Sequence, residues 1–145
     1  MNNNKQSVEA SIVIDAPIEK VWQVLTDFEN LKKWSHSFIN LKGAFRQNSY
    51  IEIEFKTPMG IQKLKKHLFH FKEGRSFGWT GVFLLGMKDY HLYKLEAISP
   101  RQTKFTQTDS VSGGASFLLK GILEKQMKKG YDAFNQELKL QVETK

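Results

Sequence analysis

The fold of this chain is decided by residues 115–143, which read ASFLLKGILEKQMKKGYDAFNQELKLQVE. The preceding Ser112-Gly113-Gly114 breaks regular structure, and Ser116 is placed to cap the start of a helix. Apolar residues then recur every three or four positions, which predicts one amphipathic helix with a single apolar face. A helix about 40 Å long with such a face needs a broad apolar surface to lie on. The apolar positions are Leu119, Ile122, Leu123, Met127, Tyr131, Phe134 and Leu138.

The rest of the chain is predicted to supply that surface as strands. The first strand covers residues 8–14, where apolar residues alternate with Glu9 and Ser11. Two short helices follow, one capped by Asp15 and running from Pro17 to about Asp27, the other covering 29–34. Because the later strands are consecutive and joined by short turns, they predict an antiparallel sheet and an α+β fold. These strands are expected at 38–45, 50–57, 62–71, 76–83, 89–98 and 103–111.

The strand at 62–71 has apolar residues in both alternation registers. Leu64 and Leu68 favour one side as the inner face, whereas Phe69 and Phe71 favour the other. The pattern alone leaves the inner face of this strand open.

Alternation along the last two strands brings polar side chains to the inner face. His91 and Tyr93 share that face with Ala97 on one strand, and Gln107 and Asp109 lie on it on the next. An inward carboxylate and imidazole can act as a general acid and base, because burial and mutual charge shift their pKa values toward neutrality. Two alternatives stay open: a buried network in which these groups satisfy each other, and polar groups that orient one end of a ligand.

Composition narrows the class of protein. A chain of 145 residues with 40% hydrophobic residues predicts one domain over 1–145, with residues 1–6 disordered. The chain has no cysteine, which excludes disulfides, thiol nucleophiles and thiolate metal sites. The first residues lack the apolar run of a secretory signal, and no segment reaches the ~20 apolar residues that span a bilayer. A soluble, cytoplasmic protein is therefore expected.

The formal net charge of +7 favours anionic partners in principle. The lysines are scattered, however, and clusters such as Lys63, Lys65 and Lys66 are expected to be solvated at the surface. Because these clusters lack interleaved exposed aromatics, we expect no nucleic acid binding and at most a weak contact with anionic membranes. His67 and His70 point to opposite faces of their strand and make no metal site. No phosphate-binding glycine loop or HExxH motif occurs, so no metal or cofactor is expected. A monomer or homodimer is expected.

Several short motifs follow one another in a set order along the chain. The first half contains IDAP at 14–17, VW at 21–22 and LTD at 25–27. The second half contains WTG at 79–81, HLY at 91–93, TKF at 103–105, SG at 112–113 and FNQELK at 134–139. In this order the motifs resemble the SRPBCC superfamily, also called START-like or birch-pollen-allergen-like. The second half resembles its polyketide cyclase/dehydrase-like bacterial branch, and the resemblance extends over residues 7–143.

The resemblance implies a helix-grip fold, in which a curved seven-stranded antiparallel sheet surrounds the long C-terminal helix and leaves a deep apolar cavity between them. The resemblance also implies that different members of the superfamily hold lipids, sterols, hormones, quinones or polyketides, and that only some members are enzymes. Members of this branch often carry Asn-Pro after the Trp of the second short helix. Here Trp34 is followed by Ser35-His36-Ser37, so ligand contacts at that corner are not carried over.

Three functions follow from these observations. The favoured one is non-enzymatic binding or carriage of a small hydrophobic molecule such as a lipid, sterol, quinone or polyketide-like compound. The second is a cyclase or dehydratase-type enzyme acting on an aromatic or polyketide-like substrate, with His91, Tyr93 and Asp109 as catalytic candidates. The third is a chaperone-linked interaction module, since some relatives of this fold act on chaperones. The candidate ligand-binding residues include the polar set His91, Tyr93, Gln107 and Asp109, whose alternative role is the buried network. The candidate pocket walls, whose alternative role is plain core, are Trp34, Phe38, Phe77, Trp79, Met127, Tyr131 and Phe134.

Overall fold

The structure of this chain is a computed structural model that describes residues 6–57, 60–82, 86–113 and 121–144. The disorder predicted for the first residues and the helix cap predicted at Ser116 fall outside these ranges, although Gln6 already belongs to the first strand. The C-terminal helix is described from Ile122 onward.

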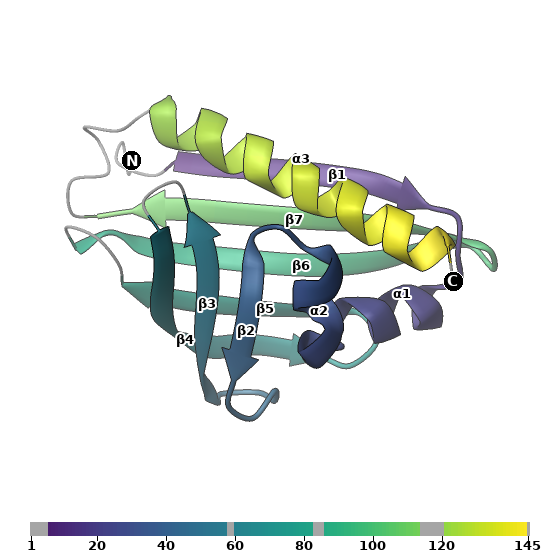
Figure 1. Ribbon diagram of the computed structural model, residues 1–145, viewed down its shortest axis with the longest axis horizontal. Helices are drawn as coiled ribbons and strands as arrows, with labels where there is room; N and C mark the ends of the chain where they lie inside the picture. The colour runs from purple at the N-terminus through teal and green to yellow at the C-terminus, as the bar shows by residue number, and fades with distance from the viewer. Residues whose placement is uncertain (1–5, 58–59, 83–85, 114–120, 145) are drawn as a thin grey trace.

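Seven strands form one antiparallel sheet in the order β1-β7-β6-β5-β4-β3-β2 (Figure 1). Two short helices follow β1, and a long helix ends the chain, so the predicted α+β helix-grip fold is confirmed. The elements are β1 (Gln6–Ile14), α1 (Ile18–Leu25), α2 (Phe28–Trp34), β2 (Phe38–Lys42), β3 (Tyr50–Thr57), β4 (Gly60–Lys72), β5 (Ser76–Val82), β6 (Lys88–Ser99), β7 (Gln102–Ser112) and α3 (Ile122–Glu143).

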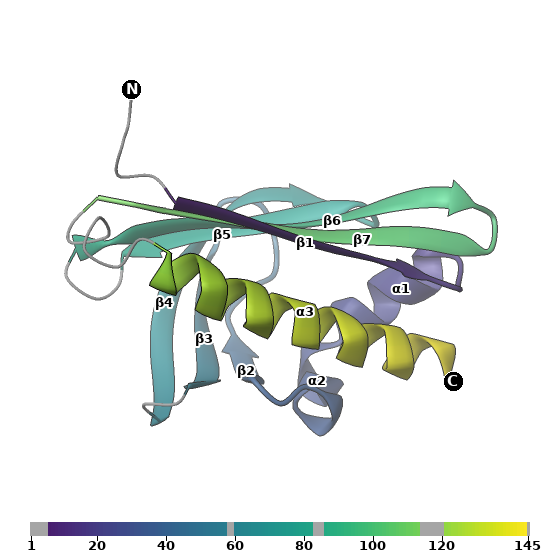
Figure 2. The ribbon, with the colours of Figure 1, turned by 90° about the horizontal axis from the view of Figure 1, so that it is seen from above.

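The sheet is strongly curved. Figure 2 shows β2, β3 and β4 turning away from the plane of β5, β6 and β7. All three helices lie on the concave side, and α3 runs along β1 and packs mainly against it (Figures 1 and 2). The concave face is therefore enclosed by α3 on one side and by α1 and α2 at one end.

The apolar stripe of α3 is buried in its C-terminal half. Phe134, Leu138 and Val142 are buried, at the four-residue spacing that places side chains on one helix face. Polar contacts add to this attachment, because the Lys139 ammonium donates to the Val13 carbonyl (2.9 Å). The backbone N–H of Asp15 also donates to Glu143 at the end of the helix (2.9 Å).

A β-bulge settles the inner face of β4. His67 pairs with Thr80 and His70 pairs with Gly78, so β4 has one more residue than β5 between these two pairs. The extra residue shifts the alternation, so Leu68 before it and Phe71 after it both face the interior. Phe69 instead packs against the partly exposed Tyr90 on the outer face, which explains why both alternation registers looked apolar.

Three local predictions are wrong. His67 and His70, predicted on opposite faces of their strand, both lie on the outer face, because the bulge between them pairs them with Thr80 and Gly78, which share one face of β5. Asp15 does not cap α1: the helix begins after Pro17, and the Asp15 carboxylate accepts a hydrogen bond from the Gln102 side chain (2.9 Å) instead. Ala97, predicted on the inner face of β6, is exposed beside the register shift between Ala97 and Ser99.

Replacing Phe134 by alanine is expected to lower the free energy of unfolding by about 3–5 kcal/mol, because its ring fills space between α3, α2 and the sheet. The ring lies 5.5 Å from that of Trp34 and 6.4 Å from that of Phe105, centroid to centroid. Leu140→Ala on the exposed side of the same helix is the matched control and should change stability by less than about 0.5 kcal/mol. Urea unfolding of both variants measures the difference, and equal losses would show that α3 is not packed as described.

Candidate functional site

Two polar links join β7 to α3 on the concave side of the sheet. The Gln107 side-chain N–H donates to Asn135 Oδ1 (2.7 Å), and the Tyr131 hydroxyl donates to Asp109 Oδ2. Gln107 and Asp109 are two residues apart on a strand, and Tyr131 and Asn135 are four apart on a helix, so each pair shares one face of its element. The links therefore lie side by side between strand and helix.

His91 extends the first link onto β6. Its Nε2 lies 2.9 Å from Gln107 Oε1, and because that oxygen can only accept, Nε2 carries the proton. Its Nδ1 lies 3.7 Å from Asp109 Oδ2, which is too far for a hydrogen bond. His91 is thus a member of the Gln107–Asn135 chain rather than an acid–base partner of Asp109 in this arrangement.

Burial keeps this group of side chains uncharged. It lowers the pKa of His91 to about 3, so the imidazole is neutral at physiological pH. Burial, reinforced by the negative charge of Asp89, raises the pKa of Asp109 to about 8, so its carboxyl group is mostly protonated near neutrality. Burial, followed by the charge of Asp109, also holds the pKa values of Tyr93 and Tyr131 well above their usual range.

Each polar link leaves one buried atom without a partner. Within the described part of the chain, neither Asp109 Oδ1 nor Asn135 Nδ2 has a hydrogen bond. The two residues are only 3% and 1% exposed, respectively, so bulk water does not reach these atoms freely. Unpaired buried polar atoms are rare in native proteins, and each needs an explanation such as an ordered water or a ligand.

Aromatic rings surround the polar group. The His91 ring stacks on Tyr93 with centroids 4.2 Å apart, and Tyr93 stacks on Phe77 at 4.6 Å. The Trp79 ring meets Tyr93 edge-on at 5.0 Å, and the Tyr131 ring lies 4.7 Å from His91. The site is therefore a small polar patch in an aromatic interior.

The remaining predicted residues lie elsewhere in the interior. Trp34 packs against Phe134 where α2 meets α3, and Met127 is half-buried on α3. Phe38 packs between Phe28 and Phe55, in the core under α2. His91, Tyr93, Gln107, Asp109 and Tyr131 are the predicted residues that come together with Asn135.

Sequence reasoning missed three residues at or near the site. Asn135 follows Tyr131 by one helical turn, a spacing that would have placed both on one face. Lys66 and Asp89 form a buried ion pair at 2.7 Å, although Lys66 was assigned to the surface and Asp89 to the end of a strand. Asp89 has the same alternation as His91, and Lys66 the same as Leu68, so their inward direction was available from the pattern.

The corner after Trp34 is tied to α3. Glu137 accepts a hydrogen bond from the backbone N–H of His36 (3.0 Å) and contacts the His36 ring. This holds the start of β2 close to the middle of α3, although the His36 side chain itself is almost fully exposed.

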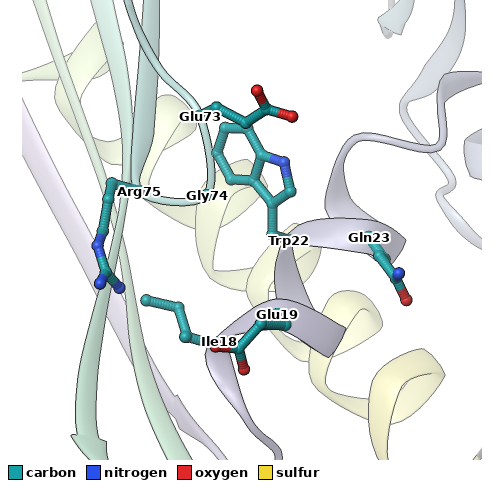
Figure 3. A pocket seen from close by; sticks show the side chains of 7 residues that line it. All are labelled: Ile18, Glu19, Trp22, Gln23, Glu73, Gly74 and Arg75. Carbon is teal, nitrogen blue, oxygen red and sulfur yellow. The ribbon is translucent and has the colours of Figure 1, made fainter.

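A separate hollow of about 390 Å³ lies between α1 and the turn joining β4 to β5. Figure 3 shows the Trp22 ring projecting from α1 toward Glu73 and Gly74 of that turn, with Arg75 nearby. None of the predicted ligand-binding residues lines it, and both acidic and basic side chains do. It is distinct from the polar group between β7 and α3.

Two further findings concern the described residues only. They contain no group of three or more His, Asp or Glu side chains arranged to hold a metal ion. No helix among them combines the length and the apolar composition that crossing a membrane requires.

The family model described as "Polyketide cyclase / dehydrase and lipid transport" matches residues 5–143. The chain belongs to this family. The resemblance to the SRPBCC superfamily is thereby confirmed. The structure adds the helix-grip sheet itself and the polar group in its interior. Among curated proteins, none is significantly similar to this chain in sequence.

Solved structures with the same fold have little sequence in common with this family member. The Zhui aromatase/cyclase of Streptomyces sp. R1128 superposes with a TM-score of 0.78 at 12% identity, covering 96% of this chain and 94% of that one. A START superfamily protein from Mycobacterium smegmatis gives 0.75 at 14% identity, covering 95% and 97%. Ara h 8.0201 gives 0.75 at 11% identity, covering 97% and 99%. At these identities the likeness establishes the fold alone.

The protonated state of Asp109 predicts a specific pH dependence. Between about pH 4 and 8 the unfolded chain releases the Asp109 proton while the folded protein keeps it, so stability falls as pH rises. His91 acts in the opposite direction between about pH 3 and 6.5, because only the unfolded chain binds its proton there. From pH 6.5 to 8 the Asp109 effect therefore acts without that opposition, with a slope of up to about 1.4 kcal/mol per pH unit.

Asp109→Asn should remove that decline, because an amide does not titrate. Urea unfolding at pH 6.5, 7.2 and 8.0 compares the wild type with this variant, and Asp132→Asn on the exposed face of α3 is the control. The same slope in all three proteins would contradict a protonated Asp109.

Proposed function

We propose that this protein binds a small, mainly apolar molecule between the concave face of the sheet and α3, and holds one oxygen-bearing end of it at Asp109 and Asn135. The observation that carries the proposal is the pair of buried atoms, Asp109 Oδ1 and Asn135 Nδ2, that have no partner among the described residues. Leaving a buried donor or acceptor unpaired costs about 1–3 kcal/mol. Two such atoms on neighbouring links favour a ligand that completes both.

The chemistry of the two atoms limits the ligand. The Asn135 amide donates, and the Asp109 carboxyl, mostly protonated near neutral pH, donates or accepts at its free oxygen. A ketone, ester, phenol or hydroxyl group fits this pair. An ionised group fits poorly, because the nearby cation Lys66 is already paired with Asp89.

The surroundings favour an apolar body for the ligand. Tyr93, Trp79 and Phe77 offer flat ring faces and edges beside the polar group. Lipids, sterols, quinones and polyketide-like rings have this combination of apolar surface and few oxygens. The family to which the chain belongs, described as "Polyketide cyclase / dehydrase and lipid transport", supports the same class of ligand.

An enzyme of cyclase or dehydratase type is the second candidate, and one observation favours it. A carboxyl group whose pKa is raised to about 8 can donate a proton to a substrate oxygen at neutral pH. The base would have to be His91, because its Nδ1 is unprotonated. That nitrogen lies 3.7 Å from Asp109 Oδ2, so no hydrogen bond joins the two groups. Conversion of a bound compound, followed by mass spectrometry over time, separates turnover from simple binding.

Native mass spectrometry of the purified protein tests the binding proposal. We expect a small molecule that remains bound in the gas phase, leaves on denaturation, and contains a carbonyl or hydroxyl group. The same compound, added back to the stripped protein, should bind with a Kd in the micromolar range or tighter. Asn135→Ala should weaken it by about tenfold, the effect of one buried hydrogen bond.

Gln136→Ala is the matched control, because Gln136 is the exposed neighbour of Asn135 on α3. It should leave the affinity unchanged. The proposal is contradicted if Asn135→Ala and Gln136→Ala bind the compound as tightly as the wild type. It is also contradicted if no bound molecule is found and the neutral probe N-phenyl-1-naphthylamine does not bind saturably.

A further inference from the structure

A second hollow lies on the outer face of the sheet, away from α3. His67 of β4 pairs with Thr80 of β5 there, and both have the alternation opposite to the buried Trp79 and Leu68. Beyond this pair β4 continues beside β3 and turns away from β5 (Figure 1). The hollow measures about 440 Å³, within the range of small-molecule sites. It is lined by Tyr50, Lys65, Lys66, His67, Thr80, Gly81, Val82 and Lys88.

The hollow has an exposed aromatic wall. Tyr50 is 64% exposed, and its ring lies 5.0 Å from the His67 ring with the planes tilted by 30°. Val82, 65% exposed, adds apolar surface to the lining. A tyrosine and a histidine side by side on the outside of a sheet offer a surface onto which a flat ring can stack.

The charges of the hollow are positive. Lys65 and Lys88 both line it, and no acidic side chain does. Among the described residues, neither lysine lies within ion-pairing distance of a carboxylate, whereas four other lysines do. The Lys65 ammonium instead lies 5.4 Å from the centre of the Tyr50 ring. Glu52, which faces Lys65 across β3 and β4, is the acidic neighbour in register.

The side chains at the base of the hollow are held in place by contacts with one another. The Lys66 side chain is only 3% exposed and crosses Gly81 to reach Asp89 Oδ1 at 2.7 Å. A Cβ at Gly81 would lie 2.8 Å from the Lys65 carbonyl oxygen and 2.9 Å from Lys66 Cδ, so only glycine fits there. The Gly81 N–H also donates to Asp89 (3.1 Å). The floor cation is thus neutralised, which leaves Lys65 and Lys88 for a ligand.

We propose that this outer hollow binds a small aromatic anion, an aryl carboxylate, with its ring on Tyr50 and His67 and its carboxylate between Lys65 and Lys88. The ring is matched by the aromatic wall, and the anion by two ammonium groups that the fold leaves without a carboxylate. The site is separate from the polar group between β7 and α3 and does not depend on what is bound there.

Titration of the ¹⁵N-labelled protein with 2-naphthoate at about 0.15 M salt, where the Debye length is about 8 Å, tests this proposal. We expect saturable shifts of the backbone amide signals of Thr80, Gly81 and Val82. Lys65→Gln and Lys88→Gln should each raise the Kd about threefold, and the double variant about tenfold, as expected for partly exposed charge pairs. Glu52→Gln should lower the Kd by about twofold, because it removes a competing negative charge.

Lys104→Gln is the matched control, since it removes the same charge from an exposed position on β7. It should change the Kd by less than about 1.5-fold, because exposed charges beyond a Debye length are screened. Equal weakening in Lys104→Gln would mean that net charge alone attracts the anion and would overturn the site. Inorganic phosphate binding as tightly as 2-naphthoate would overturn the aromatic part. Shifts confined to Gln107 and Asn135 would assign the compound to the interior and overturn the outer site.

Discussion

The structure depends on how α3 is attached to the sheet, because that helix closes the concave face. Its C-terminal half is held by burial of Phe134, Leu138 and Val142, a non-directional interaction that stabilises without fixing fine geometry. Its middle is held by two directional hydrogen bonds to β7, one that Tyr131 donates to Asp109 and one that Asn135 accepts from Gln107. The apolar half sets where the helix lies, and the polar links set its rotation about its own axis.

Burial then decides the electrostatics of the interior. Desolvation disfavours every charge there, so His91 loses its proton and Asp109 keeps one. The Lys66 ammonium donates directly to Asp89, and the Gly81 N–H adds a second hydrogen bond to the same carboxylate, so this buried pair is well satisfied. The interior therefore separates one neutral polar group, which has hydrogen-bonding capacity to spare, from one ion pair whose charges cancel. The neutral polar group suits a ligand with an uncharged oxygen. This requirement restricts the class of ligand more than the fold does.

Much of the fold and of the polar group could be predicted from the sequence, because the two-residue period of strands and the 3.6-residue period of helices decide which side chains face inward. Alternation along β6 and β7 placed His91, Gln107 and Asp109 correctly, and the helical repeat placed Phe134. What could not be predicted was the bulge between His67 and His70, since one extra residue leaves no mark in the composition of a strand. Lys66 was misassigned because a lysine in a basic run is usually solvated, and its partner Asp89 comes from β6, two strands away in the sheet. The unpaired atoms of Asp109 and Asn135 could not be predicted from the sequence, because which hydrogen bonds remain unmade depends on the packing of β7 against α3.

We propose above that the unpaired atoms of Asp109 and Asn135 are contacts for a ligand. A crystal structure of the purified protein with its co-purified molecule tests it most directly. We expect an oxygen of an organic molecule within about 3.2 Å of both Asp109 Oδ1 and Asn135 Nδ2, with the rest of the molecule against Tyr93 and Trp79. Ordered waters alone at both atoms in the loaded protein, or side chains rotated to pair with each other, would contradict it.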